Sequence, residues 1–262
     1  MMDRFWEKYR EHRLLLGTHI NSADPQLTEM IGNFGFDYLW IDMEHSTLNT
    51  NLVLQHLIAA RAAQVPAFVR IPWNDAVLAK PVLEMGVQGI IFPMVSSAEQ
   101  AEYAVRACLY PPDGIRGFGP RRAIRYGLDP VMDYIHTESK KILKLIMIET
   151  REAVENIDEI ARVEGVDVLV VGPCDLSGAY GKLNQLTDPE IRSIYRHVVD
   201  RVHAAGKPAL VSNSPYAYEN IKNWVDLGFD MITSGSDVNY VFNGAKEVME
   251  TAKSIFSAVG RL

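Results

Sequence analysis

Residues 143–149 read Leu143-Lys144-Leu145-Ile146-Met147-Ile148-Glu149, and residues 168–175 read Val168-Leu169-Val170-Val171-Gly172-Pro173-Cys174-Asp175. Each is a short run of aliphatic and β-branched residues followed by a carboxylate, which is typical of a strand buried in a parallel sheet. If the two runs are neighbouring parallel strands, Glu149 and Asp175 point into one mouth and can share a hard divalent cation. The two runs therefore predict a parallel β/α fold and a metal enzyme.

The same alternation of short β-type runs and helical segments continues along the whole chain, without a low-complexity linker. Eight runs are predicted as strands: 14–20, 37–42, 67–71, 89–92, 143–149, 166–171, 209–211 and 230–233. Helical patterns lie between them at 52–63, 77–85, 99–108, 154–163, 190–205 and 217–227. Eight β/α units predict a single (β/α)8 barrel domain over residues 1–262, with an additional helix before the first strand. A doubly wound open sheet is the alternative, but no Gly-x-Gly-x-x-Gly turn follows the first strand.

The composition narrows the possible partners and the compartment. The chain of 262 residues has 26 Lys and Arg against 33 Asp and Glu, a net charge of −7, which repels phosphate backbones and anionic lipid surfaces. No apolar run approaches the ~20 residues that span a bilayer, and the amino-terminus does not resemble a signal peptide. With two cysteines, Cys108 and Cys174, we expect a cytoplasmic protein with reduced thiols and no nucleic acid or membrane partner.

In a barrel of this kind, chemistry takes place at the carboxyl ends of the strands, and here those ends are polar. The residues at these ends are Asp42, Glu44, His45, Arg70, Glu149, Asp175, Ser212, Asn213, Ser234 and Gly235. Oxygen ligands from Glu149 and Asp175 fit Mg²⁺ or Mn²⁺ best, with Co²⁺ as a further candidate. The alternative is that Glu149 caps a helix starting at Thr150 and that Asp175 is the N-cap of the next helix.

Two further side chains are candidates for chemistry. His45 follows Asp42-Met43-Glu44, and an imidazole there could act as a general base, oriented by Asp42, Glu44 or Glu84. Arg70 has the parity of Phe68 and so points into the barrel, where it either holds a substrate oxyanion or forms a salt bridge with Glu149 or Asp42. The residues alone leave both interpretations of Arg70 open.

Five motifs, spread over nearly the whole chain and in the expected order, carry a resemblance. They are Trp40-Ile41-Asp42-Met43-Glu44-His45, Val69-Arg70-Ile71-Pro72-Trp73-Asn74, Tyr110-Pro111-Pro112-Asp113-Gly114-Ile115-Arg116-Gly117, Ile148-Glu149-Thr150-Arg151-Glu152-Ala153 and Val171-Gly172-Pro173-Cys174-Asp175-Leu176-Ser177. Together they resemble the HpcH/HpaI aldolase family, including its 4-hydroxy-2-oxo-heptane-1,7-dioate and 2-keto-3-deoxy sugar acid aldolases. Members are metal-dependent pyruvate aldolases on a (β/α)8 barrel, typically hexamers, that is trimers of dimers, in which protomers exchange the last helix.

The resemblance implies a function and a set of site residues. Members cleave a 4-hydroxy-2-oxo acid reversibly to pyruvate and an aldehyde through a metal-bound pyruvate enolate. Glu149 and Asp175 are implied as metal ligands, His45 as the base and Arg70 as the group that stabilises the enolate oxygen. The backbone of Gly172, Pro173, Cys174 and Asp175 is implied as a cradle for the pyruvate carboxylate.

A lysine Schiff base is the rival aldolase chemistry. Lys144 is the one lysine within a predicted strand, and its parity is opposite to that of Leu145, Met147 and Glu149. We therefore expect Lys144 to face the helices, which disfavours a Schiff base.

Three positions depart from the family pattern. Met147 stands where many members have Gln in contact with the oxo acid, and Glu84 stands where the acidic partner of the catalytic histidine is usually Asp. His19 replaces a frequent Trp and makes that wall of the pocket more polar. These departures leave the substrate open.

Substrate preference is predicted to lie in residues 116–125, the Gly- and Arg-rich segment between the fourth and fifth strands. Arg121, Arg122 or Arg125 could hold a distal anionic group of the aldehyde, so we expect an acidic or polyhydroxylated aldehyde. The alternative, expected for at least two of the three arginines, is a solvated basic helix start after Pro120.

The last helix carries an apolar stripe, formed by Val238, Val241, Ala245, Val248, Ala252 and Ile255. The stripe either packs on its own barrel or, as the resemblance implies, contacts another subunit. Two other function classes also stay open, namely an acyl-CoA lyase like the citrate lyase β subunit and a non-catalytic oxo-acid binding protein.

Overall fold

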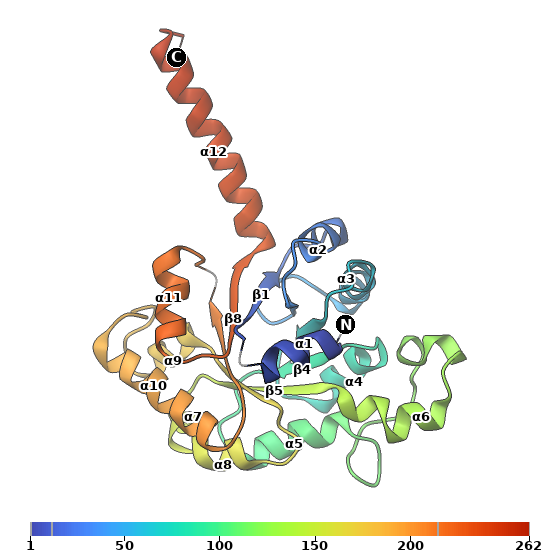
Figure 1. The fold of residues 1–262 in the computed structure, drawn as a ribbon. Coiled ribbons are helices and arrows are strands. Elements are labelled where there is room, and N and C mark those ends of the chain that lie inside the picture. The colour runs from blue at the N-terminus through green and yellow to red at the C-terminus, as the bar shows by residue number, and fades with distance from the viewer. Residues whose placement is uncertain (1, 12, 214, 262) are drawn as a thin grey trace.

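In the computed structural model, which describes residues 2–11, 13–213 and 215–261, eight parallel strands close into a barrel. β1 pairs with both β2 and β8, which completes the ring, as Figure 1 shows. The predicted (β/α)8 barrel is therefore confirmed. The strands are β1 (Leu15–Ile20), β2 (Tyr38–Asp42), β3 (Ala67–Arg70), β4 (Gly89–Phe92), β5 (Leu143–Ile148), β6 (Val168–Val171), β7 (Ala209–Asn213) and β8 (Met231–Ser236).

Helices surround the barrel and follow the strands in turn, apart from α1, which precedes β1. They are α1 (Met2–Arg10), α2 (Pro25–Gly32), α3 (Thr50–Ala62), α4 (Ala76–Glu84), α5 (Ala98–Cys108), η1 (Arg122–Gly127), α6 (Val131–His136), η2 (Glu138–Lys141), α7 (Arg151–Glu155), α8 (Ile157–Arg162), α9 (Pro173–Ala179), α10 (Pro189–Ala204), α11 (Tyr218–Asp226) and α12 (Asp237–Ala258). Among the described residues, none of these helices combines the length and the apolar character needed to cross a membrane.

Alternation of side chains along each strand divides the core into two layers. Trp40, Phe68 and Met147 belong to the cluster inside the barrel, whereas Ile41 and Val69 belong to the larger cluster between the strands and the helices. Both faces of β2, β5 and β6 are therefore apolar, which explains the continuous aliphatic runs in the sequence. The same parity directs Arg70 inward, as the sequence predicted.

The helix α1 closes the barrel at the amino-terminal ends of the strands. Its Phe5 is 2% exposed, and the Phe5 ring lies edge-on to the rings of Tyr38, at 6.2 Å, and Phe68, at 5.6 Å. An aromatic plug from outside the β/α repeat therefore completes the inner core. The prediction of an additional amino-terminal helix is confirmed.

Several predicted elements differ from the structure. The single helix expected over 154–163 is wrong: α7 ends at Glu155, and α8 starts at Ile157. The break falls at Asn156, whose Nδ2 donates to the Ser96 carbonyl oxygen at 2.9 Å, a tertiary contact that the local pattern cannot reveal. β7 and β8 also run beyond their predicted ends, so that Asn213 and Ser236 are still strand residues.

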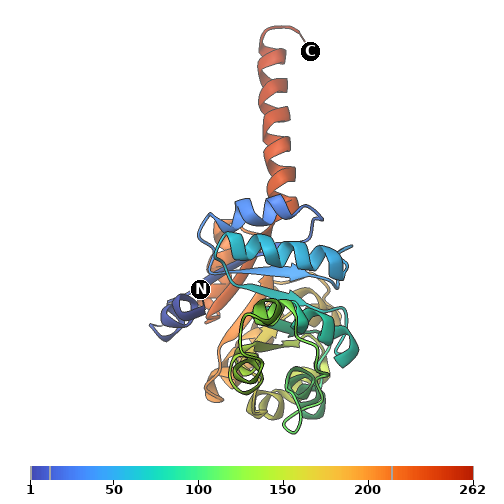
Figure 2. The same cartoon turned by 90° about the vertical axis from the view of Figure 1, so that its right-hand side faces the viewer.

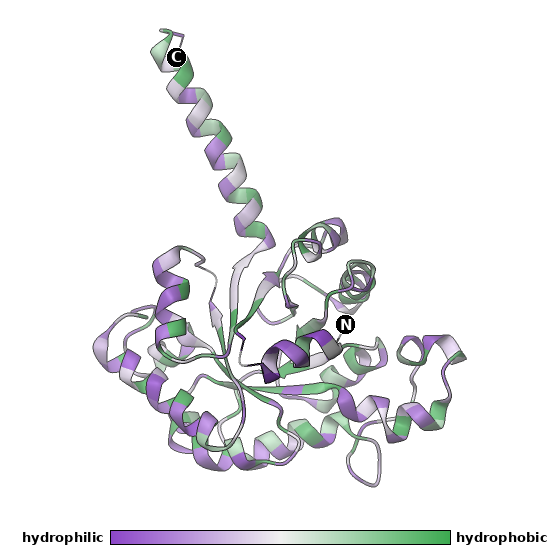
Figure 3. Ribbon diagram, viewed as in Figure 1, coloured by the Kyte–Doolittle hydropathy of each residue, from purple (hydrophilic) through white to green (hydrophobic). Residues whose placement is uncertain are grey.

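The long helix α12 leaves the barrel instead of packing on it. Figures 1 and 2 show it projecting from the end of β8, and Figure 3 shows apolar and polar residues alternating along it. Its apolar stripe is open, and Val248 is 67% exposed. Packing of this stripe on its own barrel, one of the two interpretations of the sequence, is therefore wrong for this chain.

We expect Phe5→Ala to lower the free energy of unfolding by about 3 kcal/mol, because it leaves a cavity beneath Tyr38 and Phe68. Phe34→Ala is the matched control, since Phe34 is 79% exposed and its loss should change stability by less than about 0.5 kcal/mol. Chemical denaturation measures both. Equal destabilisation by the two variants would show that Phe5 does not complete the core.

Candidate active site

A cavity of about 390 Å³ opens at the carboxyl ends of the strands. Residues from β1, β2, β3, β5 and β7 and from the loop after β6 line it. Seven of the predicted site residues are among them: His45, Arg70, Met147, Gly172, Pro173, Cys174 and Asp175. The closed ring therefore gathers residues that lie more than one hundred positions apart in the chain.

Arg70 is held in place by two acids from the neighbouring strand and its loop. Its Nε donates to Asp42 Oδ1 at 2.9 Å and its Nη2 to Asp42 Oδ2 at 2.5 Å, while Nη1 lies 2.9 Å from Glu44 Oε2. The guanidinium also lies over the Trp40 ring and is 6% exposed. The salt bridge to Asp42, one of the predicted alternatives, is therefore formed, and the bidentate pair fixes the direction of the guanidinium.

The pKa of Asp42 is lowered by its pairing with Arg70. Burial by itself raises the pKa of Asp42, but the hydrogen bond and the positive charge of Arg70 outweigh burial and bring the pKa below its ordinary value. The pair is therefore charged at neutral pH, with the acid and the base both ionised inside the mouth.

Glu149 is a buried carboxylate at the end of β5. It is 3% exposed, and its Oε1 accepts a hydrogen bond from the Met94 backbone N–H at 2.6 Å. The pKa of Glu149 is raised to about 7, mainly by burial and in smaller part by the negative charges of Glu44 and Asp175, against the opposing effects of the Met94 N–H and Arg70. A divalent cation beside this carboxylate would relieve both burial and repulsion, so the donor set fits a metal ion.

Glycine is required at position 172 by the close approach of this acid. A Cβ on Gly172 would lie 2.6 Å from Glu149 Oε2 and 3.1 Å from the Met147 methyl carbon. Glu149 thus lies directly behind the β6 loop that forms the cavity wall. The bare backbone at Gly172 lets the acid from β5 and the loop after β6 meet.

Neither acid caps a helix. The helix α7 begins at Arg151, and its N-cap is Thr150, whose hydroxyl accepts from the Ala153 N–H. The helix α9 has Gly172 as its N-cap, so Asp175 lies within the first turn and opens onto the cavity. The capping interpretation is therefore wrong for both acids, which leaves their oxygens available to a ligand.

His45 and Glu84 are not neighbours in the described chain. The His45 side chain is 62% exposed at the cavity, and its Nε2 lies 3.9 Å from Glu44 Oε2. Glu84, at the end of α4, instead pairs with Arg116 Nη2 at 3.2 Å. Within one chain the carboxylate beside the histidine is thus Glu44, and Glu84 lies outside the cavity lining.

The three arginines predicted to bind the anionic group of the aldehyde also lie outside this cavity. Arg122 donates to the Leu57 carbonyl oxygen at 3.1 Å, and Arg125 donates to Asp129 Oδ1 at 2.8 Å. Arg121 is exposed on the excursion between β4 and β5 and is not among the residues that line the cavity. The solvated alternative therefore holds for Arg125, whereas Arg122 is half-buried and has a local role at two backbone carbonyls.

Sequence reasoning missed one contact in the wall opposite Glu149. His19 on β1 and Ser212 on β7 both line the cavity, and their side chains lie 2.8 Å apart. The sequence shows a polar residue at each strand end, but the two are 193 positions apart, so no local pattern joins them.

Lys144, by contrast, behaves as predicted: its Nζ lies 3.0 Å from Asp167, before β6 and away from the cavity.

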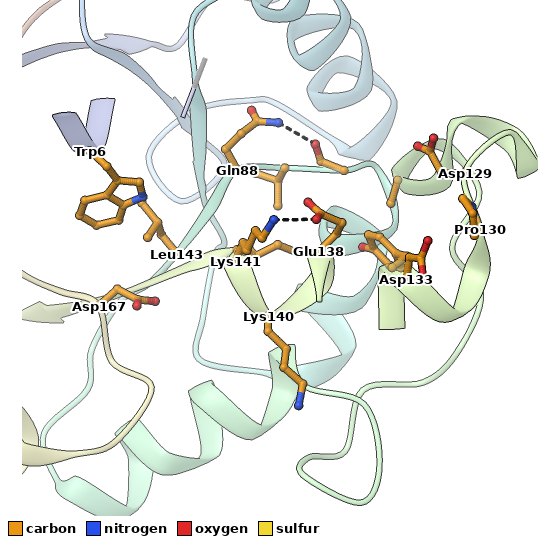
Figure 4. Close-up of a pocket in the computed structure, with 15 residues that line it drawn as sticks. Trp6, Gln88, Asp129, Pro130, Asp133, Glu138, Lys140, Lys141, Leu143 and Asp167 are labelled. Atoms are coloured by element: carbon orange, nitrogen blue, oxygen red, sulfur yellow. Dashed lines mark hydrogen bonds and ion pairs between the residues drawn. The ribbon is translucent and has the colours of Figure 1, made fainter. Parts of the chain in front are cut away.

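A larger cavity of about 870 Å³ lies at the opposite end of the barrel. It is lined at the starts of β4, β5 and β6 by Gln88, Leu143 and Asp167. The segment between β4 and β5, which carries Glu138 and Lys141, lines its other side (Figure 4). Glu138 and Lys141 pair with each other at 2.6 Å. Because barrel chemistry resides at the carboxyl ends, the smaller cavity with the buried acid and arginine is the candidate active site.

Comparison with known proteins finds aldolases among the relatives of this chain. A 4-hydroxy-2-oxo-heptane-1,7-dioate aldolase of Salmonella paratyphi C (strain RKS4594) is 34% identical over 248 residues, covering 94% of this chain and 93% of that protein. A 5-keto-4-deoxy-D-glucarate aldolase of Shigella boydii serotype 18 is 33% identical over 232 residues, covering 88% and 89%. A solved structure of an HpcH/HpaI aldolase/citrate lyase family protein from Burkholderia cenocepacia J2315 matches with a TM-score of 0.87 and 26% identity, covering 94% of this chain and 98% of that chain.

These relatives define the class of enzyme as an aldolase, which is a carbon–carbon lyase. The model of the HpcH/HpaI aldolase/citrate lyase family matches residues 15–244, from β1 into α12. The chain belongs to this family.

We expect Asp42→Asn to lower the free energy of unfolding by about 3 kcal/mol at pH 7, because it leaves the buried Arg70 charge poorly compensated. The folded pKa of Asp42 is lowered, so its contribution is complete above the ordinary pKa of about 4 and is lost as the pH falls through the folded value. The stability difference between wild type and variant should therefore shrink below about pH 4.

Denaturation as a function of pH measures this difference. Asp113→Asn, which removes the exposed partner of Lys140, is the control and should have little effect at any pH. A difference for Asp42→Asn that grows on acidification would contradict the assignment.

Proposed function

We propose that this enzyme cleaves a 4-hydroxy-2-oxo acid reversibly to pyruvate and an aldehyde, with the help of a divalent cation. The observation that carries the proposal is the buried Glu149 carboxylate, which lies close to the charge of Asp175 and behind the Gly172 wall of the cavity that Arg70 lines. Membership of the aldolase family supports the reaction type. The substrate class follows from the requirement for an oxo acid that can use both the cation and the guanidinium.

Glu149 and Asp175 are the residues that would hold the cation. Both offer carboxylate oxygens, which favour Mg²⁺ or Mn²⁺ and also accept Co²⁺. No group of three or more His, Cys, Asp or Glu side chains with metal-binding spacing occurs among the described residues, so water and substrate oxygens would complete the ligand set. When bound, the cation supplies positive charge beside the 2-oxo oxygen, where negative charge develops.

Arg70 supplies the second positive charge. Cleavage of the C3–C4 bond leaves an electron pair that moves onto the 2-oxo oxygen of the pyruvate fragment as an enolate. A guanidinium fixed by Asp42 and Glu44 needs no reorganisation when that charge appears, and such preorganised groups contribute much of the rate enhancement in enzymes. Arg70 is accordingly the stabiliser of the enolate oxygen.

His45 handles the proton. In the cleavage direction its imidazole takes the proton of the 4-hydroxyl group as the aldehyde carbonyl forms, and in the condensation direction it returns that proton. The exposed position of His45 at the cavity suits a group that exchanges protons with water. Glu44, at 3.9 Å, is the carboxylate in place to orient the ring.

The loop after β6 is proposed to hold the pyruvate carboxylate. Gly172, Pro173, Cys174 and Asp175 line the cavity where α9 begins, and the first turn of a helix presents N–H groups without intrahelical partners. Met147 completes this wall with its sulfur 3.9 Å from Arg70 Nη1. A thioether here packs against the oxo acid and leaves its polar contacts to the loop and to Arg70.

Exchange of the pyruvate methyl protons with deuterium tests the proposal without knowledge of the aldehyde. We expect NMR to detect exchange with Mg²⁺ or Mn²⁺, its loss after chelation, and a decrease of at least about 100-fold in Glu149→Gln. Glu164→Gln, in the turn before β6, is the matched control and should exchange as wild type does. Binding of pyruvate without exchange in any metal would point to a binding protein and refute the aldolase proposal.

We also propose that the enzyme is a hexamer, a trimer of dimers, in which α12 is exchanged between protomers. A helix of 22 residues is about 33 Å long, and little of α12 contacts its own barrel. Because isolated helices are marginal in water, an apolar stripe of this length requires a cover. A second copy of the chain, which presents the same stripe, is the occupant that symmetry supplies.

We expect Val248→Asp to shift the protein from the hexamer to smaller species, because it buries a charge in the proposed contact. Ser254→Asp places the same charge on the polar side of α12 and should leave the assembly unchanged. Sedimentation velocity distinguishes the outcomes. A wild-type protein that sediments as a monomer would overturn the proposed exchange.

The cytoplasm stays the predicted location. Cys108 and Cys174 are both free thiols, which suits a reducing compartment.

A further inference from the structure

The wall of the cavity formed by β1 and β7 contains a buried histidine whose two ring nitrogens are both engaged. His19 Nδ1 lies 2.9 Å from the Gly235 carbonyl oxygen, and Nε2 lies 2.8 Å from Ser212 Oγ. The His19 ring is almost fully buried and lies against the Trp40 ring. Its orientation is therefore fixed by contacts on three sides.

The partners determine which nitrogen carries the proton. A carbonyl oxygen only accepts hydrogen bonds, so Nδ1 must donate to Gly235. Burial lowers the pKa of His19 to about 4, so the ring is neutral at physiological pH and Nε2 is an acceptor. The Ser212 hydroxyl therefore donates its hydrogen to His19, and the lone pairs of Ser212 Oγ are left to accept from a ligand in the cavity.

The neighbouring residue adds a second acceptor to this wall. Asn213 Nδ2 donates one hydrogen to the Pro215 carbonyl oxygen at 3.3 Å, and the amide oxygen of Asn213 is an acceptor. The wall contributes no cationic side chain, since Arg70 is the one Lys or Arg among the described residues that line the cavity. Arg70 itself is held by Asp42 and Glu44. A ligand group beside Ser212 therefore meets the acceptor lone pairs of its Oγ, with no Lys or Arg side chain among the described residues of this wall.

The position of the wall decides which part of the substrate it meets. In the closed ring β1 lies four strands from β5, so His19 is across the barrel from Glu149. Under the proposed function, pyruvate is anchored at the β5 and β6 side by Glu149, Asp175 and the Gly172 loop. The aldehyde part of the substrate then extends toward Ser212.

We propose that the His19–Ser212 pair selects an aldehyde with a hydroxyl group beside its carbonyl, because that hydroxyl can donate a hydrogen bond to Ser212 Oγ. Ser212 makes the contact, and His19 is a positioning residue that holds the serine hydrogen away from the substrate. A carboxylate in the same place would meet the lone pairs of Ser212 Oγ without a Lys or Arg side chain among the described residues of this wall to compensate its charge. This inference rests on the proposed aldolase function, and it moves substrate preference from the arginine segment to the β1–β7 wall.

The test compares three small aldehydes in condensation with pyruvate. Glycolaldehyde and propionaldehyde have the same number of heavy atoms and differ by a hydroxyl in place of a methyl group, while glyoxylate carries a carboxylate. We expect wild type to prefer glycolaldehyde over both in kcat/KM. Ser212→Ala should reduce the glycolaldehyde to propionaldehyde ratio by about five- to tenfold, the effect of one neutral hydrogen bond, whereas Ser212→Thr, which keeps the hydroxyl, should retain it.

His19→Phe tests the positioning role separately. Once Ser212 is released, its hydroxyl can donate as well as accept, so the ratio of glycolaldehyde to glyoxylate should fall about fivefold. The change should appear in the KM for the aldehydes that carry a polar group, with the KM for propionaldehyde unchanged, a pattern that general damage to the fold would not produce. Ser193→Ala, on the exposed face of α10, is the control and should keep both ratios.

The outcomes separate this inference from the proposed function. Wild-type protein that exchanges the pyruvate methyl protons but shows no preference for glycolaldehyde, or a preference that survives Ser212→Ala, overturns the inference and leaves the aldolase function standing. A preference for glyoxylate would also overturn the inference, because it would show that a cationic group binds the substituent of the aldehyde. Wild-type protein that neither exchanges nor condenses overturns both.

Discussion

The ion pairs of Arg70 with Asp42 and Glu44 are the interaction on which the mouth of this barrel depends. A guanidinium that points into a barrel is unfavourable unless acids meet it with suitable geometry, and here the adjacent strand supplies a bidentate carboxylate. The pair is possible because β2 and β3 are in register with Asp42 opposite Arg70. The register of one strand pair therefore fixes the direction of the positive charge that the proposed reaction uses.

Around that arginine the acids are in excess. Glu149, Asp175, Asp42 and Glu44 interact with one another, and Arg70 neutralises only part of their charge, which is why burial and repulsion together raise the pKa of Glu149. Such a site is unfavourable when empty and favourable for a divalent cation. In the proposed function, a divalent cation would offset this excess of negative charge and so allow an anionic oxo acid to approach.

The wall formed by β1 and β7 is polar but uncharged. Each hydrogen bond in it has a defined donor and acceptor. The Gly235 carbonyl fixes the His19 tautomer, His19 fixes the Ser212 hydrogen, and the cavity meets the remaining lone pairs. In the proposed reaction, the oxo acid is therefore anchored on one side of the barrel and the aldehyde is selected on the other. Variation at β1 and β7 can alter the aldehyde without disturbing Arg70 or Glu149, as expected of a fold that accommodates new substrates at its strand ends.

The sequence by itself determined the barrel, the inward direction of Arg70, the outward direction of Lys144 and the placement of Glu149 and Asp175 after neighbouring strands. Parity and aliphatic runs are local properties, and the interior of a closed barrel enforces them. The tertiary structure alone decided the break at Asn156, the pairing of Glu84 with Arg116, the contact of His19 with Ser212 and the departure of α12 from its own barrel. Each of these depends on atoms that meet across a long span of chain, or on a surface left uncovered, and no local pattern of residues specifies which distant group will be the partner.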